Sequence, residues 1–185
     1  MILERVLNYA KTLLQKAVSE GDIVIDGTAG NGHDTLYLAK LVGLTGHVYA
    51  FDIQQSAIEA TKQKLGEFEN HATVIHDGHE HINKYVNQEI SAAVFNLGYL
   101  PGANHTTITR PETTIVAIES CLKLLKVGGV VVIVVYHGHE GGDIERDALV
   151  NYVSELPQSS IQVLKYEFIN QVNHAPFILA IEKTK

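Results

Sequence analysis

A glycine-rich segment, residues 26–34, reads Asp-Gly-Thr-Ala-Gly-Asn-Gly-His-Asp and lies between an apolar β-branched run and a helical pattern. Gly30 and Gly32 let the backbone pass close to a ligand, and the helix start offers free N–H groups to it. The spacing matches neither the dinucleotide fingerprint nor a P-loop. The segment predicts a nucleotide-binding corner of another kind, or else a tight turn in some other α/β protein.

Acidic residues follow three predicted strands, and in an open α/β sheet ligands bind at that end of the strands. Asp26 ends the first strand, Asp52 ends the second, and Asp77 follows the third. We expect Asp52 to accept hydrogen bonds from both ribose hydroxyls of a nucleoside, with help from Gln54. Asp77 is expected to accept from an adenine amino group, with His79 packed against the ring.

Polar and aromatic residues follow the later strands. Asn96-Leu97-Gly98-Tyr99 comes after the fourth strand, although this segment could be an ordinary turn. If a substrate of this site must lose a proton in a reaction, histidine or tyrosine side chains on loops near the ligand could assist the proton transfer. The candidates are His105, Tyr136, His137 and His139.

Two further hypotheses concern the binding of a metal ion and of an anionic group. His79, His137 and His139 could bind a metal, but no cysteine or second ligand set at a helical spacing supports this, so no metal is expected. Arg110 is a candidate for binding an RNA phosphate or a cofactor carboxylate; a surface ion pair with Glu112 is the alternative.

These residues must be positioned by alternating strands and helices. Apolar periodicity predicts an N-terminal helix over residues 2–19 that covers the sheet or lines the pocket. Ser56 with Glu59 and Thr109 with Glu112 read as capping boxes that open two helices, and Gly128-Gly129 is expected to end the second. Strands are predicted at 22–25, 47–52, 71–76, 91–95, 130–135, 161–169 and 176–181, and further helices at 35–42 and 143–156.

The connection between the last two strands is too short for a helical crossover, so they should be antiparallel. The fold class is therefore α/β: a doubly wound, mostly parallel, seven-stranded Rossmann-like sheet with a C-terminal antiparallel hairpin. We expect one domain over residues 1–185, with residues 1–20 forming the helix on the sheet.

Composition limits the function classes. The chain has 185 residues, 45% hydrophobic and 19% charged, which is typical of a globular domain. The longest apolar run is too short to span a membrane, the N-terminus does not read as a signal peptide, and one cysteine fits a reducing cytoplasm. A net charge of −7 argues against a large electrostatic footprint on nucleic acid, although a local basic patch could contact RNA.

The acidic strand end with its Gly-x-Gly turn resembles motif I of class I S-adenosylmethionine-dependent methyltransferases. Asn96-Leu97-Gly98-Tyr99 stands where amino methyltransferases have Asn-Pro-Pro-Tyr, with Leu97 and Gly98 replacing the prolines. The resemblance implies that Asp26 faces the amino-acid end of the cofactor, that Asn96 accepts from the target amine, and that Tyr99 stacks on the substrate.

Nearly the whole chain resembles one family, the small single-domain group long labelled putative rRNA methylases. The segments that carry this resemblance are residues 26–34, Asp-Gly-His at 77–79, Asn-Leu-Gly-Tyr-Leu-Pro-Gly at 96–102, Thr-Arg-Pro-Glu-Thr-Thr at 109–114 and Tyr-His-Gly-His-Glu-Gly-Gly at 136–142. The family implies S-adenosyl-L-methionine as cofactor and the anticodon region of tRNA as partner. The acceptor would be the primary amine of 5-aminomethyl-2-thiouridine at the wobble position.

On this basis the expected residues fall into three groups. Cofactor-binding residues are Asp26, Thr28, Gly30, Asn31, Gly32, Asp52, Gln54, Asp77, His79 and Asn96; catalytic residues are Asn96, Tyr99, His137 and His139; substrate-binding residues are Tyr99, His105, Arg110 and Tyr136.

The lone cysteine bears on the acceptor. Methylating a uridine carbon usually needs a nucleophilic cysteine, and Cys121 lies in a predicted helix among apolar residues, which favours a nitrogen or oxygen acceptor. An rRNA or small-molecule amine methyltransferase, and a non-catalytic binding module, are the alternatives. The oligomeric state, including a homodimer, stays open.

Overall fold

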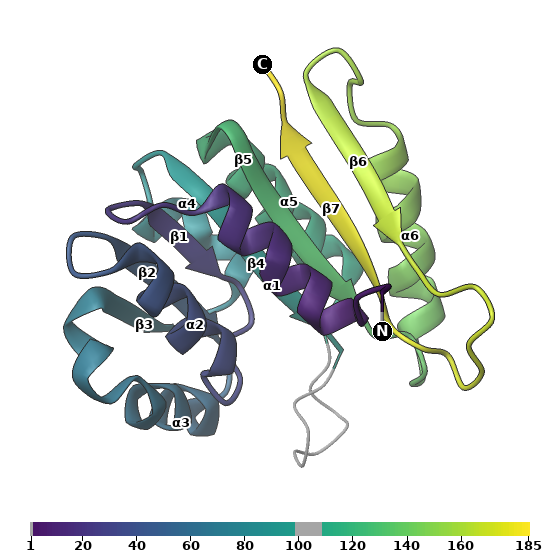
Figure 1. Ribbon diagram of the computed structural model, residues 1–185. Helices are drawn as coiled ribbons and strands as arrows, with labels where there is room; N and C mark the ends of the chain where they lie inside the picture. The colour runs from purple at the N-terminus through teal and green to yellow at the C-terminus, as the bar shows by residue number, and fades with distance from the viewer. Residues whose placement is uncertain (1, 99–108) are drawn as a thin grey trace.

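Seven strands form one sheet in the computed structural model, which describes residues 2–98 and 109–185 (Figure 1). The strands are β1 Ile23–Asp26, β2 His47–Asp52, β3 Ala72–His76, β4 Ile90–Leu97, β5 Leu125–Val135, β6 Ile161–Tyr166 and β7 Phe177–Lys183. Their order is β3-β2-β1-β4-β5-β7-β6. Strands β1 to β5 pair in parallel, and β7 runs antiparallel to both β5 and β6. The predicted doubly wound sheet with a C-terminal antiparallel hairpin is confirmed.

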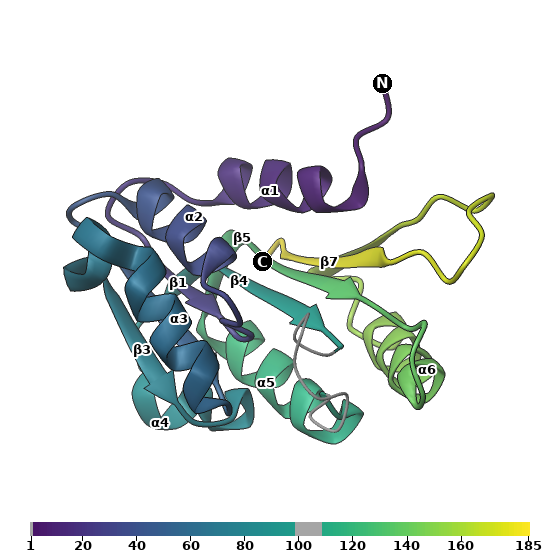
Figure 2. The same cartoon turned by 90° about the horizontal axis from the view of Figure 1, so that it is seen from below.

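Helices cover both faces of the sheet (Figure 2). They are α1 Val6–Ala17, α2 His33–Val42, α3 Gln55–Leu65, α4 Ile82–Tyr85, α5 Pro111–Leu124 and α6 Gly142–Ser154, with short 3₁₀ helices η1 Gly66–His71 and η2 His79–His81. Figure 2 shows α1 and α2 above the sheet and α4, α5 and α6 below it. Two apolar clusters, one for each face, form the core.

The middle of the core is β5, whose β-branched run faces both clusters. Val131, Ile133 and Val135 pack into one cluster, and Val130, Val132 and Val134 into the other. This alternation is what a strand covered on both faces requires, and it confirms the expected central strand. Cys121 on α5 is fully buried, and burial raises the pKa of its thiol, so it is a core residue as expected.

Two predicted helix starts are wrong. Helix α3 begins at Gln55, so Ser56 and Glu59 lie inside it and do not form a capping box. Helix α5 begins at Pro111, one residue after its N-cap Arg110. The Thr109 hydroxyl instead donates to Glu145 at 2.8 Å, so a partner distant in the sequence takes the group expected to cap the helix.

The expected helix end at Gly128-Gly129 is also wrong. Helix α5 ends at Leu124 and β5 begins at Leu125, so both glycines lie in the strand. A Cβ atom at position 129 would lie 2.8 Å from the Ser91 carbonyl oxygen and from the Leu125 side chain. Gly129 is therefore needed for the close approach of two strands.

Other element ends differ from the predictions by a few residues. The N-terminal helix covers Val6–Ala17 rather than 2–19, and β6 ends at Tyr166 rather than at 169. No helix in the described part of the chain has the length and apolar character needed to cross a membrane.

Candidate functional site

A large cavity of about 1060 Å³ lies at the carboxyl ends of the parallel strands. Pockets for small ligands usually have about 300–1,000 Å³, so this one has room for a nucleoside cofactor and an acceptor together. The predicted residues that line it are Thr28, Gly30, Asn31, Asp52, Gln54, Asp77, His79, Asn96, Arg110, Tyr136 and His139. Helix α1 contributes Ala10 and Leu14, which also belong to the core, so this helix covers the sheet and lines the pocket.

The other five predicted site residues fall into two groups. Asp26, Gly32 and His137 lie outside the wall of this cavity as the described residues define it. Tyr99 and His105 lie outside the described residues.

The glycine-rich loop between β1 and α2 is held by contacts to neighbouring strands. The Gly27 N–H donates to the Val94 carbonyl, and the Ala29 N–H donates to the Phe51 carbonyl, each at 2.9 Å. Gly30 and Gly32 have φ values of 53° and 79°, in the left-handed region that favours glycine. The loop thus has a fixed shape that leaves one edge of its backbone open to the cavity.

The Asp26 carboxylate lies beneath this loop and is fully buried. It accepts hydrogen bonds from the Thr35 hydroxyl at 2.6 Å and from the Thr28 N–H at 3.1 Å. Burial, reinforced by Asp34, raises the pKa of Asp26 from 3.8 to about 7. The structure therefore gives Asp26 a role in holding the loop and the first turn of α2, whereas direct contact with a ligand was expected.

This raised pKa predicts a pH-dependent stability. Between pH 3.8 and about 7 the folded chain keeps a proton on Asp26 that the unfolded chain has lost, so the free energy of unfolding falls as pH rises. Asp26→Asn keeps an acceptor for the Thr28 N–H and offers the Thr35 hydroxyl an N–H group to accept from, but it cannot ionise. Urea unfolding at several pH values should show a smaller decline for the variant. Equal slopes for variant and wild type would contradict the assignment.

Asp52 joins the loop to β2 and faces the cavity. One carboxylate oxygen accepts from the Gly30 N–H and the other from the Gln54 N–H, both at 2.9 Å. Each carboxylate oxygen has a second lone pair, so both can still accept a hydroxyl hydrogen bond. Asp52 is thus held in a fixed orientation with two acceptors available to a diol.

Asp77 and His79 form the next part of the wall. Asp77 accepts from the His81 ring at 2.7 Å and from the Tyr85 hydroxyl at 2.8 Å, which lowers its pKa to about 2. His79 is nearly buried, and its Nδ1–H donates to the Gly27 carbonyl at 3.0 Å. Burial lowers the pKa of His79, so the ring is neutral and its Nε2 is an acceptor.

An Asn–Asp pair stands at the end of β4. The Asn96 side-chain Nδ2 donates to the Asp34 carboxylate at 2.5 Å, and the Asn96 backbone N–H donates to the Thr28 hydroxyl at 2.7 Å. A carboxylate only accepts, so this bond fixes which way the amide points. Sequence reasoning missed Asp34, because its partner lies 62 residues away.

Burial raises the pKa of Asp34, partly offset by the Asn96 hydrogen bond and the Lys11 charge. Tyr136 lies close enough for Asp34 to contribute, after burial, to a raised pKa of the phenol. Asp34, Asn96 and Tyr136 therefore form one polar group on the cavity wall, at the end remote from Asp77 along the sheet order.

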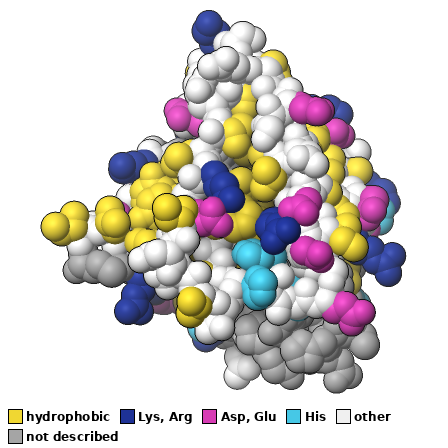
Figure 3. Space-filling view, turned by 90° about the vertical axis from the view of Figure 1, so that its right-hand side faces the viewer, with side chains coloured by type: hydrophobic (Ala, Val, Ile, Leu, Met, Phe, Trp, Pro, Cys, Tyr) yellow, Lys and Arg dark blue, Asp and Glu magenta, His cyan; other side chains and the backbone are white. Residues whose placement is uncertain are grey.

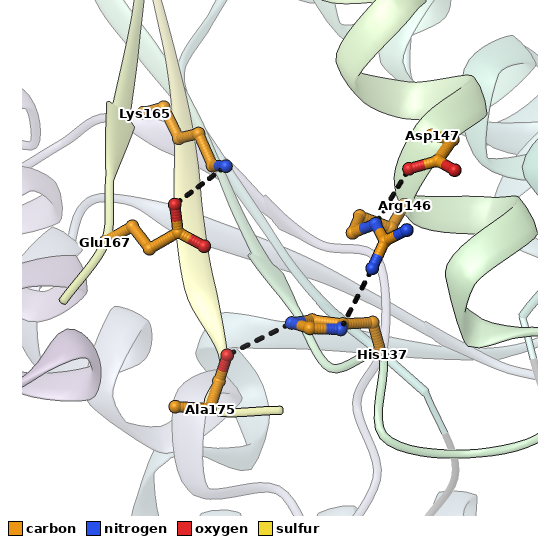
Figure 4. Close-up of polar contacts among 6 residues, drawn as sticks. All are labelled: His137, Arg146, Asp147, Lys165, Glu167 and Ala175. Carbon is orange, nitrogen blue, oxygen red and sulfur yellow. Dashed lines mark hydrogen bonds and ion pairs between the residues drawn. The ribbon is translucent and has the colours of Figure 1, made fainter. Parts of the chain in front are cut away.

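His137 is not among the residues that line the large cavity, and its contacts are shown in Figure 4. Its Nε2–H donates to the Ala175 carbonyl at 3.2 Å, and its Nδ1 faces the Arg146 guanidinium at 3.5 Å. Burial lowers the pKa of His137. His139 from the same loop lines the large cavity, so of these two histidines, both predicted to be catalytic, only His139 faces it.

Within residues 2–98 and 109–185, no group of three or more histidine, cysteine or acidic side chains is arranged to hold a metal ion. His79, His137 and His139 do not converge on one point, since His137 lies outside the cavity that the other two line.

Comparisons with known proteins agree with this geometry. A family model described as "Putative rRNA methylase" matches residues 48–182. A curated relative from Arabidopsis thaliana, "tRNA (mnm(5)s(2)U34)-methyltransferase, chloroplastic", is 36% identical over 180 residues. The match covers 91% of this chain and 66% of the relative, so the chain spans about two thirds of that protein's length.

Two solved structures are similar over nearly their whole length. A "putative rRNA-methylase" from Clostridium thermocellum has a TM-score of 0.97 and 39% identity, covering 99% of this chain and 100% of that one. A "putative methyltransferase" from Streptococcus mutans in complex with SAH has a TM-score of 0.91 and 43% identity, covering 98% and 99% of the two chains. The second of these shows the same fold holding the demethylated form of a methyl donor.

Proposed function

The chain belongs to the rRNA methylase family of S-adenosylmethionine-dependent methyltransferases, and we propose that it methylates a primary amine on tRNA. The substrate proposed is 5-aminomethyl-2-thiouridine at the wobble position, and the product is 5-methylaminomethyl-2-thiouridine. The name and 36% identity of the Arabidopsis relative support this acceptor. The Asn96 amide on the cavity wall is the structural observation that favours an amine.

The residues of the cavity fit S-adenosylmethionine. Asp52 offers two oriented acceptors to a ribose diol, and the glycine-rich loop leaves space beside them. His79 and Asp77, which follow the edge strand β3, provide a ring and a carboxylate for a purine. When bound, S-adenosylmethionine supplies an electrophilic methyl group on a sulfonium.

Asn96 would hold the acceptor. With its Nδ2 engaged by Asp34, the amide oxygen is the atom left to accept a hydrogen bond from an incoming amine. This contact orients the nitrogen lone pair, and positioning of this kind can supply about 7–11 kcal/mol of a barrier. A primary ammonium must first lose a proton. Asp34, Tyr136 and His139 are the ionisable groups of the cavity wall that we propose as candidates for accepting it.

Asp52→Ala should weaken binding of S-adenosylhomocysteine by about 1.5–3 kcal/mol, the range for a lost hydrogen bond to a charged group. Isothermal calorimetry measures this directly. Glu59→Gln, on the exposed side of α3, is the control and should leave the affinity unchanged. Unchanged affinity in Asp52→Ala would mean that the ribose lies elsewhere, and binding of NAD in place of S-adenosylhomocysteine would remove the cofactor assignment.

The experiment that tests the substrate is nucleoside mass spectrometry of bulk tRNA from a strain lacking this gene. We expect 5-aminomethyl-2-thiouridine to accumulate and its methylated form to disappear, and a plasmid copy of the wild-type gene to restore it. An unchanged tRNA profile would refute the proposal. The net charge of −7 favours a small-molecule amine as the second candidate, which purified enzyme with free amines would reveal.

A further inference from the structure

A second, smaller cavity of about 390 Å³ adjoins the proposed catalytic site. It lies between His137, which follows β5, and the connection from β6 to β7. Asn173 and His174 line both this cavity and the large one, so the two share a wall. Whatever enters the smaller cavity therefore lies next to whatever occupies the large one.

The small cavity has the chemistry of a nucleobase site. The His137 and His174 rings meet edge to face, with centroids 5.6 Å apart, and Phe168 adds a third aromatic side chain to the lining. Gln171 and Asn173 carry amide side chains with both donors and acceptors. Flat rings with amide groups around them bind single-stranded bases by stacking and by hydrogen bonds to the base edge.

Cations border this cavity. Arg146 bonds Asp147 at 2.7 Å and approaches His137, and Lys165 pairs with Glu167 at 2.8 Å (Figure 4). Ion pairs on the surface contribute little, so a phosphate can compete for these cations. Figure 3 shows histidine side chains gathered on this face of the molecule beside basic and acidic ones. Two cations thus stand beside this cavity, each paired with an acidic residue, in a chain whose net charge is −7.

The shared wall is held in an uncommon backbone conformation. Asn173 and His174 are consecutive and have φ values of 63° and 52°. Residues other than glycine seldom adopt this conformation, and sites of function often retain such strain. Gly138 packs beneath, since a Cβ there would lie 3.3 Å from the His174 Cβ. The two loops therefore fit together and fix His174 between the cavities.

We propose that the smaller cavity binds the base of a nucleotide adjacent to the acceptor in the RNA. The inference rests on the proposed function, because it presupposes an RNA acceptor in the large cavity. Its consequence is that the β6–β7 connection selects the RNA, while the large cavity performs methylation.

The test uses two variants. Phe168→Leu removes the aromatic ring but keeps an apolar side chain, and Gln171→Ala removes the amide group of an exposed residue. A labelled anticodon stem-loop is titrated with protein saturated with S-adenosylhomocysteine, and fluorescence anisotropy gives Kd. We expect about tenfold weaker binding for Phe168→Leu, given the strength of base–aromatic stacking. Val172→Ala, on the same connection but outside both cavities, is the control and should bind like wild type.

A second RNA carries an abasic nucleotide on the 5′ or the 3′ side of the acceptor position. On one side the wild-type protein should lose about tenfold in affinity, while Phe168→Leu loses nothing further, because the two changes remove the same contact. The proposal would be overturned if the abasic RNA and the Phe168→Leu substitution weakened binding independently of each other. Wild-type affinity for the stem-loop in both Phe168→Leu and Gln171→Ala, with unchanged Tm, would overturn it as well. If the wild-type protein methylates no RNA, the proposed function fails and the inference fails with it. If it methylates tRNA but Phe168→Leu binds the stem-loop like wild type, the inference alone fails.

Discussion

Replacing Asn96 by alanine should reduce kcat by about 100-fold or more while leaving the affinity for S-adenosylhomocysteine within about threefold of wild type. The change removes the amide oxygen proposed to hold the acceptor nitrogen, and a misplaced acceptor costs rate much more than it costs cofactor binding. Asn96 keeps its backbone bond to Thr28 in the variant, so the loop should retain its shape. Methyl transfer to tRNA in single turnover, with calorimetry of S-adenosylhomocysteine, separates the two effects.

Asp34 provides the companion measurement. Asp34→Ala removes the acceptor that fixes the Asn96 amide, so kcat should fall, whereas Asp34→Asn retains an oxygen that can accept from Nδ2 and should recover part of the rate. A loss confined to KM for S-adenosylmethionine would show instead that Asp34 binds the cofactor. Wild-type kcat in Asn96→Ala would remove the amide from the mechanism altogether.

The sequence predicted the strands of this fold well because their signal is local. The run Val130–Val135 consists of β-branched residues, and such a run can be satisfied only between two covered faces. Two of the three acidic residues at strand ends reach the cavity as predicted, because a parallel sheet brings the carboxyl ends of its strands to one edge, whereas Asp26 is buried. Asp52 and Asp77, from neighbouring strands, accordingly line one cavity.

Contacts between residues far apart in the chain could not be predicted from local sequence patterns. Thr109 and Glu112 have the spacing of a capping box, but the Thr109 hydroxyl is taken by Glu145, which the sequence places 36 residues later. Asp26 and Asp34 belong to the same motif, yet only packing decides that Asp26 is buried and that Asp34 meets Asn96. The separation of His137 from His139 likewise depends on Ala175 and Arg146.

The glycine-rich loop carries the last prediction. Gly32→Ala should lower the free energy of unfolding by about 2–5 kcal/mol and Tm by about 10 °C. Two costs add: Gly32 has a φ of 79°, and a Cβ there would lie 2.8 Å from the Thr61 Cα on α3, which is backbone and cannot rotate away. Relief of this contact must move the loop, so the affinity for S-adenosylhomocysteine should fall as well.

Gly141→Ala is the matched control. Gly141 has nearly the same left-handed conformation, with φ 79° and ψ −6°, but a Cβ there would meet nothing within 4 Å among the described residues, so only the conformational cost of about 1–2 kcal/mol remains. The difference between the two variants in urea unfolding isolates the close approach of the loop to α3. Equal destabilisation would mean that the loop does not need a glycine for space, and unchanged cofactor affinity in Gly32→Ala would mean that the shape of the loop does not determine binding.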